Sequence, residues 1–409
     1  MNRVVITGLG VISPNGIGKE AFLKSLKEGK SGIGKITRFD TSKYRSHLGG
    51  EVTNFNPKDY INPVKIRRMD RDSQIAVASA ILALRDADLE ITSGNSPECG
   101  VILGSGFTGL ETTEAFHRGL IEHGPSGVNP MLFPNTVPNA PAGHISIELG
   151  ITGPNSTITQ KGATGEGAIG YAYSLLRHDK AKVILTGGVD ELSWILFHAY
   201  SHLGILSPLK NEDYPEGCRP FDKRRNGMVL GEGGGILALE TLEHARERGA
   251  RIYAEVIGYG MSSSNPGISD YDEDSEGMAR TMELALEDAG IPKEKIGYIS
   301  AAANSTPVLD KSETEAIKKV FGRDIPVSSL SSSVGYFNAS GGLKAISACL
   351  AIENGFILPT INYREKDPFC DLDYIPNKIR EKKIEAVLIN GFADGGSNAS
   401  LILKRFQGV

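Results

Sequence analysis

The sequence is poor in the side chains with which many enzymes carry out covalent and acid–base chemistry. It has four cysteines, eight histidines and one tryptophan in 409 residues. No cysteine lies between Cys99 and Cys218, and no histidine follows His244. Residues 245–409 therefore have no imidazole, and any proton transfer by a side chain of this segment must use another kind of group.

Other absences exclude broad classes of protein. No apolar run approaches the roughly 18 residues that span a bilayer, and the N-terminus has neither the basic start nor the cleavage site of a signal peptide. The net charge of −5 gives no sign of nucleic acid or an anionic membrane as a partner. We therefore expect a cytoplasmic protein without membrane insertion.

The cysteines also lack the spacing of a metal site or a CxxC redox motif. They are Cys99, Cys218, Cys349 and Cys370. We interpret them as free thiols in a reducing compartment and expect no metal centre.

Glycine, in contrast, is abundant, with 49 residues spread along the chain beside apolar runs. Short β-branched runs alternate with longer helical patterns, which indicates an α/β fold with largely buried strands. The predicted strands are 4–7, 101–103, 183–186, 236–239, 386–389 and 401–403. The predicted helices are 73–88, 163–177, 275–289 and 341–353, and the polar, acidic stretch 260–276 is predicted to be a long surface loop.

A faint internal repeat links two parts of the chain. Residues 153–190 follow the order strand, glycine-rich turn, helix and apolar strand, and residues 326–396 follow the same order. Two such α/β halves packed face to face would bring both turns to one central site.

Several motifs in order along the chain carry a specific resemblance. They are residues 3–14, 219–227, 231–233, 304–310 and 391–398. Together they resemble β-ketoacyl-acyl carrier protein synthases of the elongating type. The resemblance implies a thiolase fold with five α/β/α/β/α layers, a two-fold dimer, and two ketosynthase-like halves, 1–250 with capping insertions and 251–409.

The chemistry of that family requires an acylated cysteine at a strand-to-helix turn, two histidines that stabilise an enolate, a lysine that orders one of them, and a phenylalanine on the C-terminal loop. Carried over by position, these groups fall on Gly162, Ala302, Tyr336, Ser331 and Asp394. The catalytic set is absent, and we predict no condensing activity for the chain alone. The gap in cysteine and histidine makes this independent of small shifts in alignment.

The resemblance also assigns a pocket for the acyl chain and the pantetheine arm. Its residues are Phe107, Asn304, Thr306 and Phe392. Phe107 has two interpretations, packing in the core or closing the end of the acyl tunnel.

The replaced positions also allow two interpretations each. Gly162 either relieves crowding at the turn or makes room for a ligand or partner chain. Gln160 and Lys161 either line the dimer contact or form an altered site. Tyr336 either satisfies a buried neighbour or replaces histidine as an acid. Asp394 is either a turn residue or a pocket charge paired with Lys161.

A short basic run contains Lys65, Arg67 and Arg68. Such runs are usually solvated surface, but the resembling enzymes present positive charge to acidic acyl carrier protein at this place. We therefore consider it as a carrier-protein docking site.

Three functions fit these residues. The favoured hypothesis is a chain-length-factor-like subunit of fatty acid or polyketide biosynthesis, forming a homodimer or a heterodimer with an active ketosynthase. It needs no cofactor beyond the phosphopantetheine arm of acyl carrier protein, which is the substrate arm. The alternatives are an enzyme with altered acyl-thioester chemistry (hydrolysis, acyl transfer or isomerisation) and a homodimeric protein that binds acyl chains or acyl carrier protein.

Overall fold

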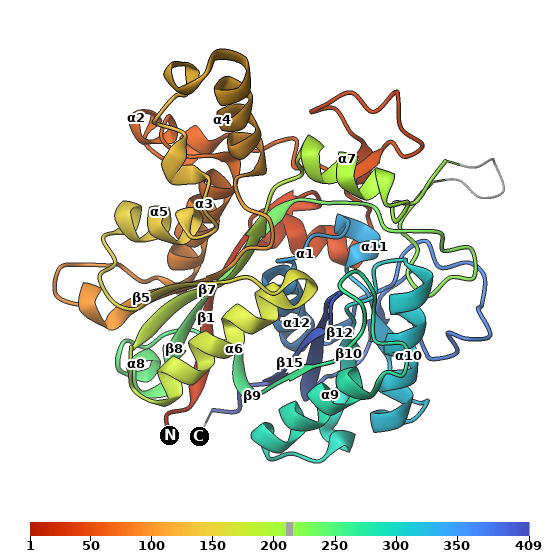
Figure 1. The fold of residues 1–409 in the computed structure, drawn as a ribbon. Helices are drawn as coiled ribbons and strands as arrows, with labels where there is room; N and C mark the ends of the chain where they lie inside the picture. Colours follow the sequence, from red (N-terminus) through yellow and green to blue (C-terminus); the bar gives the residue numbers. More distant parts are fainter. Residues whose placement is uncertain (210–215, 409) are drawn as a thin grey trace.

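A large mixed sheet runs through the molecule (Figure 1). The computed structural model describes residues 1–209 and 216–408. From the centre outward, the strands of the first half are β1 (Val4–Ser13), β8 (Gly233–Thr241), β7 (Val183–Asp190), β5 (Cys99–Gly104) and β6 (Asn155–Ile158). Those of the second half are β9 (Ala254–Ser263), β15 (Ser397–Lys404), β14 (Ala386–Phe392), β10 (Ile296–Ser300) and β11 (Val327–Ser328). The halves meet where β1 pairs with β9.

The two halves repeat the same arrangement of strands. In each half the three outer strands are parallel, and the two inner strands are antiparallel to their neighbours. The units β6–α6–β7 and β11–α12–β14 occupy corresponding places, with α6 at Thr164–Arg177 and α12 at Gly341–Asn354. The repeat expected from the sequence is therefore confirmed.

Helices form three layers around the two halves of the sheet. Helices α6 and α12 contact strands of both halves and make the central layer. The outer face of the first half is covered by α3 (Arg71–Ala87) and α5 (Ala140–Leu149). The outer face of the second half is covered by α9 (Glu276–Ala289) and α10 (Pro307–Phe321). This is the expected five-layer thiolase-like fold.

The burial of these elements follows from their residues. Helix α12 is buried from Gly341 to Ile352, because apolar and small residues occupy nearly all of its positions, Lys344 excepted, and sheet strands lie on both faces. Strands β7 and β14 are likewise buried along their whole length, as is typical of strands covered by helices on both faces. Helix α9 ends at Gly290, whose φ of 61° suits glycine.

The remaining elements cap this core or connect its parts. The helices are α1 (Lys19–Glu28), α2 (Pro63–Ile66), α4 (Leu110–His123), α7 (Trp194–His202), α8 (Leu242–Glu247) and α11 (Ser331–Val334). The short strands are β2 (Gly16–Ile17), β3 (Ile33–Lys35), β4 (Leu48–Gly50), β12 (Phe356–Ile357) and β13 (Arg380–Glu381). Across the described ranges, no helix has both the length and the apolar character needed to span a membrane.

Candidate functional site

The turn between β6 and α6 is where the resemblance places a nucleophile. A single 3-10 turn, Lys161–Ala163, leads into the helix, and the Gln160 N–H donates to the Thr164 hydroxyl oxygen at 2.7 Å. Lys161 has a φ of 46°, a left-handed conformation that costs a non-glycine residue about 1–3 kcal/mol. Its side chain is tied down, since Nζ donates to Asp394 Oδ2 at 2.6 Å and to the Ile268 carbonyl at 3.1 Å. Asp394 therefore has the second of its two interpretations, a charge paired with Lys161.

The space beside Gly162 is already occupied. A Cβ atom added to this residue would lie 2.6 Å from the Phe392 carbonyl oxygen and 2.9 Å from the Tyr336 hydroxyl oxygen. The first of these atoms belongs to the backbone and cannot move aside cheaply. This close approach accounts for glycine at the turn, and it places Gly162, Tyr336 and Phe392 side by side.

Ala302 and Ser331 are buried next to the same region but carry small side chains. Ala302 lies in the apolar cluster that also contains Phe392, and its N–H donates to Glu313 Oε1 at 2.9 Å. Ser331 begins α11, and its carbonyl accepts a bond from the Gly335 N–H at 3.0 Å. Neither side chain can act as a proton donor to a thioester in the way that imidazole or ammonium can.

Three tyrosines line a cavity of about 460 Å³. Besides Tyr200, Tyr271 and Tyr336, the wall includes Thr306 and Asp394. Burial, with Asp394 adding a smaller effect, raises the pKa of each phenol above its ordinary value. All three rings therefore remain neutral at physiological pH, so these hydroxyls can donate hydrogen bonds but cannot serve as bases.

Neighbouring amides hold two of these phenols in place. The Tyr336 hydroxyl donates to Asn338 Oδ1 at 3.0 Å. Asn304 Nδ2 donates to the Tyr271 hydroxyl oxygen at 3.3 Å. Tyr336 is thus a buried phenol with a satisfied neighbour, the first of its two interpretations.

The prediction of a surface loop at 260–276 is partly wrong. Residues 260–263 complete β9, and the rest folds back over the cavity so that Ser269, Asp270, Tyr271 and Glu273 contribute to its wall. The run of polar and acidic residues was read as fully solvated, but it contains one aromatic residue, Tyr271. Tyr271 forms part of the cavity wall. An aromatic residue within an otherwise polar run was the feature of the sequence that indicated a loop covering a pocket.

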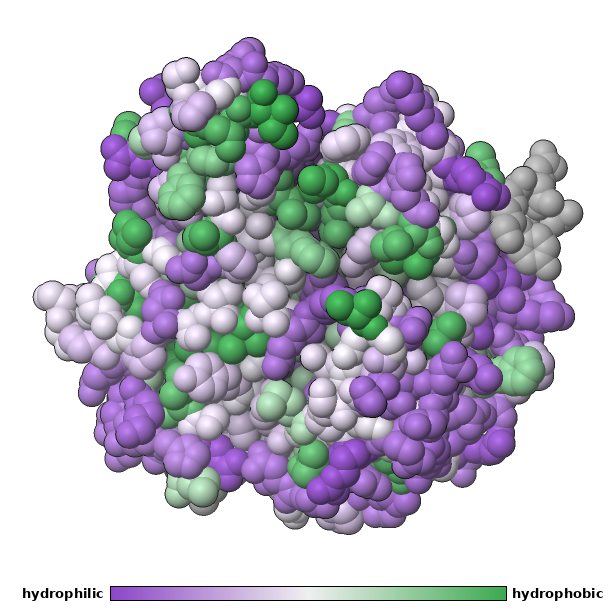
Figure 2. Space-filling view, in the orientation of Figure 1, coloured by the Kyte–Doolittle hydropathy of each residue, from purple (hydrophilic) through white to green (hydrophobic). Residues whose placement is uncertain are grey.

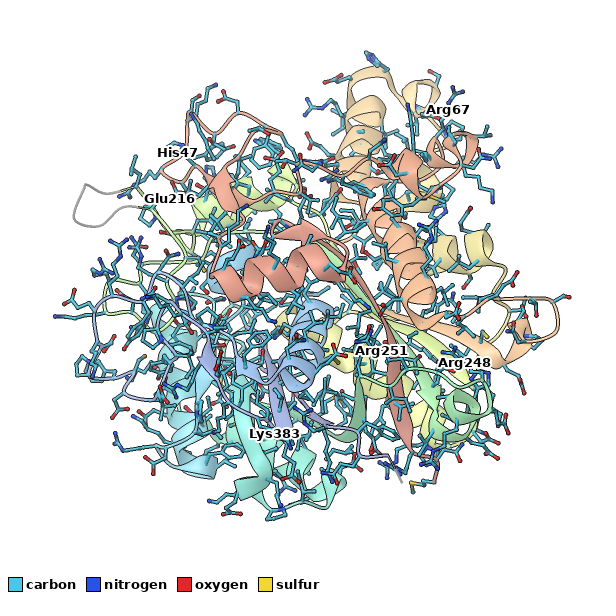
Figure 3. The ribbon with its side chains drawn as sticks, turned by 180° about the vertical axis from the view of Figure 1, so that it is seen from behind. His47, Arg67, Glu216, Arg248, Arg251 and Lys383 are labelled. Carbon is cyan, nitrogen blue, oxygen red and sulfur yellow. The ribbon has the colours of Figure 1, made fainter. Side chains whose placement is uncertain are left out.

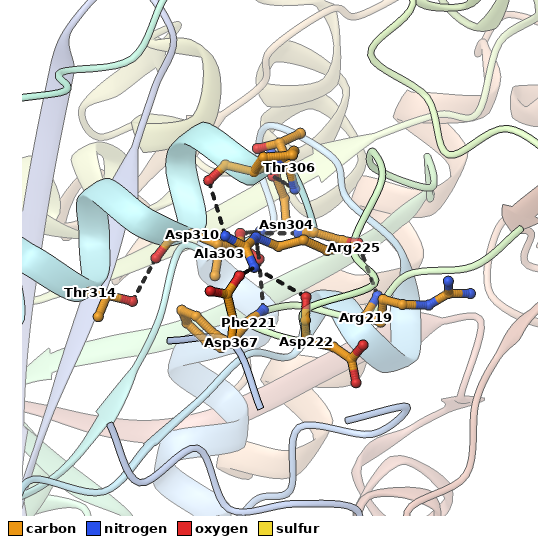
Figure 4. Close-up of polar contacts among 12 residues, drawn as sticks. Arg219, Phe221, Asp222, Arg225, Ala303, Asn304, Thr306, Asp310, Thr314 and Asp367 are labelled. Carbon is orange, nitrogen blue, oxygen red and sulfur yellow. Dashed lines mark hydrogen bonds and ion pairs between the residues drawn. The ribbon is translucent and has the colours of Figure 1, made fainter. Parts of the chain in front are cut away.

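The loop that carries Asn304 and Thr306 is fixed by Asp310 (Figure 4). Asp310 Oδ1 accepts bonds from the N–H groups of Asn304 (3.0 Å) and Ser305 (3.1 Å), and Oδ2 accepts one from the Phe221 N–H at 2.8 Å. The Thr306 hydroxyl donates to Asn304 Oδ1 at 2.6 Å. Two motifs that are distant in sequence, around 219–225 and 304–310, thus form one hydrogen-bonded unit beneath the cavity.

Little free space remains beside Phe107. The void there measures about 10 Å³ and is bounded by Tyr336, Tyr200 and Leu196, among others. This is room for no more than one water molecule. The Phe107 backbone is also fixed, because Asp190 Oδ1 accepts bonds from the N–H groups of Gly106 (2.8 Å) and Phe107 (3.2 Å). The position expected at the end of an acyl tunnel is therefore closed within this chain.

A buried ion pair behind the turn was not anticipated from the sequence. Glu166, on the first turn of α6, is fully buried and contacts the ammonium of Lys344, which lies on α12 and also donates to the Asn390 carbonyl. Burial raises the pKa of Glu166, and Lys344 counteracts the shift. Glu166 Oε2 lies so close to Gly391 that an added Cβ would meet it at 2.5 Å. Through these contacts the ion pair connects α6, which follows the turn, to α12 of the central layer and to the end of β14.

The basic run lies on and just after α2, away from the cavity; Figure 3 shows Arg67 near the outer edge of the molecule. Lys65, Arg67 and Arg68 are exposed. Lys65 Nζ is 2.9 Å from Glu148 Oε2, so one of the three charges is shared with a carboxylate.

Within residues 1–209 and 216–408, strand β6 pairs on one side only, with β5, and so forms an edge of the sheet. Gln160 lies just beyond it, with Nε2 3.6 Å from the Met261 sulfur. Large exposed apolar residues lie on the helices and connections around this edge, and Figure 2 shows apolar side chains gathered on the same side as α6. They include Ile147 on α5 and Tyr171 on α6, two helices that contact β6.

The four cysteines are free and buried, and none lies at the turn. Burial raises the pKa of each thiol, to about 11 for Cys99. In residues 1–209 and 216–408, no group of three or more His, Cys, Asp or Glu side chains is arranged to hold a metal ion.

Comparison with known proteins gives matches along nearly the whole chain. The family model of the β-ketoacyl synthase N-terminal domain matches residues 1–245, and that of the C-terminal domain matches residues 253–364. The chain is 40% identical over 410 residues to 3-oxoacyl-[acyl-carrier-protein] synthase 2 of Staphylococcus aureus strain COL, with 99% of each protein covered. It is 39% identical over 409 residues to the protein of the same name from Synechocystis, covering 99% of this chain and 98% of the relative.

Solved structures of ketosynthases also match nearly the whole chain. The ishigamide ketosynthase/chain length factor has a TM-score of 0.92 at 36% identity, covering 99% of this chain and 100% of that one. A type II polyketide synthase acyl carrier protein in complex with its ketosynthase bound to the hexaketide has a TM-score of 0.90 at 30% identity, with 99% and 100% covered.

Proposed function

The chain belongs to the β-ketoacyl synthase family, and we propose that it is a non-condensing member that pairs with an active ketosynthase as a chain-length-factor-like subunit. The observation that carries the proposal is the filled space at Gly162. A backbone carbonyl and a phenol hydroxyl stand 2.6 and 2.9 Å from the point where the side chain of a nucleophile would begin. The site lacks a thiol and has no room for one.

The groups that would stabilise an enolate are missing as well. Ala302 and Ser331 offer no charge or strong donor, and Tyr336 donates its hydrogen to Asn338. The members of a catalytic set act as a unit with strongly non-additive effects, so restoring one of them alone does not restore condensation. Lys161 does not replace them, because Asp394 holds its amine.

The exposed edge of the sheet at β6 supports pairing with a second subunit. The edge of β6 has unpaired backbone groups and apolar neighbours, so a second ketosynthase fold can extend the sheet there. The void at Phe107 is closed within this chain. In a pair, the chain would therefore shape the tunnel of its partner from across the interface. It needs no cofactor, and the phosphopantetheine arm of acyl carrier protein would deliver acyl groups to the partner in the cytoplasm.

The proposal is tested by two measurements, acylation of the purified chain and its copurification with an active ketosynthase. We expect the purified chain to gain no acyl mass when incubated with acyl-acyl carrier protein, measured by intact-protein mass spectrometry. Gly162→Cys should also fail to produce ketoacyl product, and overpacking at the turn should destabilise it by about 1–3 kcal/mol. Co-expression with an intact ketosynthase encoded in the same genome should give a heterodimer that copurifies and condenses.

Gly162→Ala is the matched control, because it adds the same Cβ without a thiol and should lose the same stability in denaturant titrations. A stable acyl adduct within residues 158–166 of the natural chain, or ketoacyl product from Gly162→Cys alone, would show that the catalytic groups have been misplaced. A chain that never exchanges into a heterodimer would favour a homodimeric binding protein instead.

The basic run gives a second expectation. If Arg67 and Arg68 meet an acidic carrier protein, changing both to glutamate should weaken binding, mainly by slowing association at low salt. The loss should shrink as salt rises, because exposed charges are screened within about 10 Å at 0.1 M ionic strength. Surface plasmon resonance over a range of salt concentrations measures this.

The control for this experiment is the double change Lys24→Glu with Lys30→Glu, which alters the net charge equally on and after α1, where both residues are exposed. It should leave the association rate nearly unchanged. Equal losses in both variants would mean that overall charge, and not a docking site, governs the encounter.

A further inference from the structure

Helix α7 carries a row of rings on the side away from the cavity. The helix lies on the outside of the molecule, near the top of Figure 1. Trp194, His198 and His202 follow one another at intervals of four residues, so they share one face of the helix. Tyr200, which lines the cavity, lies about 160° around the helix from both histidines. The row is therefore distinct from the cavity of the candidate functional site.

The two imidazole rings of this row lie next to each other. Their centroids are 4.2 Å apart and their planes meet at 44°. His202 is exposed and His198 is partly exposed, and neither Nε2 atom has a hydrogen-bond partner among the described residues. Metal–nitrogen bonds of about 2.0–2.1 Å hold two ligand nitrogens roughly 3 Å apart, a separation that rings this close reach by small rotations. Two histidines four residues apart on one helix face are an arrangement with which helices bind zinc.

Hydrogen bonds to the other ring nitrogens prepare both histidines as ligands. His202 Nδ1 donates to the His198 carbonyl oxygen at 2.8 Å; since a carbonyl only accepts, the lone pair of the neutral ring is on Nε2. His198 Nδ1 lies 2.9 Å from the Tyr44 hydroxyl oxygen, which also accepts a bond from Trp194 Nε1 at 3.0 Å. A phenol oxygen can accept from both nitrogens, and His198 Nε2 is then free as well. Such bonds fix the tautomer and orientation of metal-binding histidines.

We propose that His198 and His202 bind one divalent transition-metal ion of the Cu²⁺, Ni²⁺ and Zn²⁺ class through their Nε2 atoms, with Tyr44 as a positioning residue. Imidazole nitrogen suits these ions, whereas Mg²⁺ prefers oxygen ligands. Within residues 1–209 and 216–408 no third His, Cys, Asp or Glu completes the set, so water fills the remaining coordination positions. The site depends neither on the edge of β6 nor on a ketosynthase partner, and its failure would leave the proposed function untouched.

Trp194 provides a reporter at the site. It is the only tryptophan of the chain, and its ring centroid is 5.0 Å from that of His198. Cu²⁺ and Ni²⁺ quench the fluorescence of a ring this close through their unpaired electrons, and Zn²⁺, with its filled d shell, does not. In titrations of the full chain without an affinity tag, we expect quenching that saturates at one ion per chain, with Cu²⁺ binding more tightly than Ni²⁺. Excess Zn²⁺ should restore the fluorescence quenched by Ni²⁺, and Mg²⁺ should have no effect.

Two variants remove or misorient a ligand. His202→Ala should weaken Ni²⁺ binding at least about tenfold, the smaller of the losses typical when even an outer partner of a metal ligand is removed. Its circular dichroism should be unchanged, because the side chain is exposed. Electron paramagnetic resonance of bound Cu²⁺ should show two nitrogen ligands in the natural chain and one in His202→Ala. Tyr44→Phe removes the hydroxyl beside His198 and should weaken Ni²⁺ several-fold.

The matched control is His117→Ala with His123→Ala. These two histidines are also exposed, but they are six residues apart on α4 and lie on different faces of that helix. The control should bind Ni²⁺ as tightly as the natural chain. No quenching at millimolar Ni²⁺, quenching that His202→Ala leaves unchanged, an equal loss in the α4 control, or quenching by Mg²⁺ would each overturn the proposal.

Discussion

Replacing Lys344 with methionine should destabilise the protein by about 3–5 kcal/mol, the range seen when one partner of a buried ion pair is removed. Lys344 is 5% exposed and Glu166 is fully buried, so the variant would leave a carboxylate without its cation in the centre of the molecule. It would also remove the bond to the Asn390 carbonyl. The free energy of unfolding from denaturant titration measures the loss.

The effect should depend on pH in a defined direction. Burial already raises the pKa of Glu166 in the natural protein, and removing Lys344 raises it further. A group whose pKa is higher folded than unfolded stabilises the fold at low pH and loses that contribution as pH rises through the folded value. The deficit of Lys344→Met should therefore be smaller at pH 5 than at pH 8.

The control is the double variant Lys344→Met with Glu166→Leu. Since it replaces both charges by apolar groups, it should recover much of the stability lost by the single variant. A double variant as unstable as Lys344→Met alone, with no dependence on pH, would mean that the lysine acts only through packing of its methylene groups.

The ion pair of Glu166 and Lys344 could not be predicted from the sequence. Both helices were predicted, α6 from 163–177 and α12 from 341–353, but no pattern gives the register between helices that lie 178 positions apart in the chain. Charged residues in a helix usually face water, so Glu166 and Lys344 look like ordinary surface residues. Only the central layer, covered on both sides by strands, makes them buried partners.

The fold, in contrast, could be predicted from the sequence. Continuous apolar runs such as 183–186 predict strands covered on both faces, and the repeat of turn and helix at 153–190 and 326–396 predicts two similar halves. Motif positions also placed Gly162, Tyr336 and Asp394 at one site. Tyr200 and Tyr271 were missed because they reach the cavity from a capping helix and an acidic loop, whose paths are set by tertiary packing.

We expect the chain to form a dimer, and Thr157→Arg should convert it to a monomer. Thr157 lies on β6, whose outer edge pairs with no strand of the described residues, and its Cα is in register with Leu103 of β5 on the other side. Its hydroxyl oxygen is buried without a hydrogen-bond partner. A long charged side chain on an edge strand opposes pairing with a second sheet, and the apolar residues around it can bury their surface only if that pairing forms.

Light scattering at micromolar concentration measures the outcome. The natural chain should have roughly twice the 43.8 kDa mass of one chain, and Thr157→Arg should approach the mass of one chain while its circular dichroism is unchanged. Thr157→Val keeps the β-branched shape without charge and should remain dimeric. A natural chain that is a stable monomer, alone and with a ketosynthase present, would remove both the dimer and the chain-length-factor role, since each depends on a second ketosynthase fold against β6.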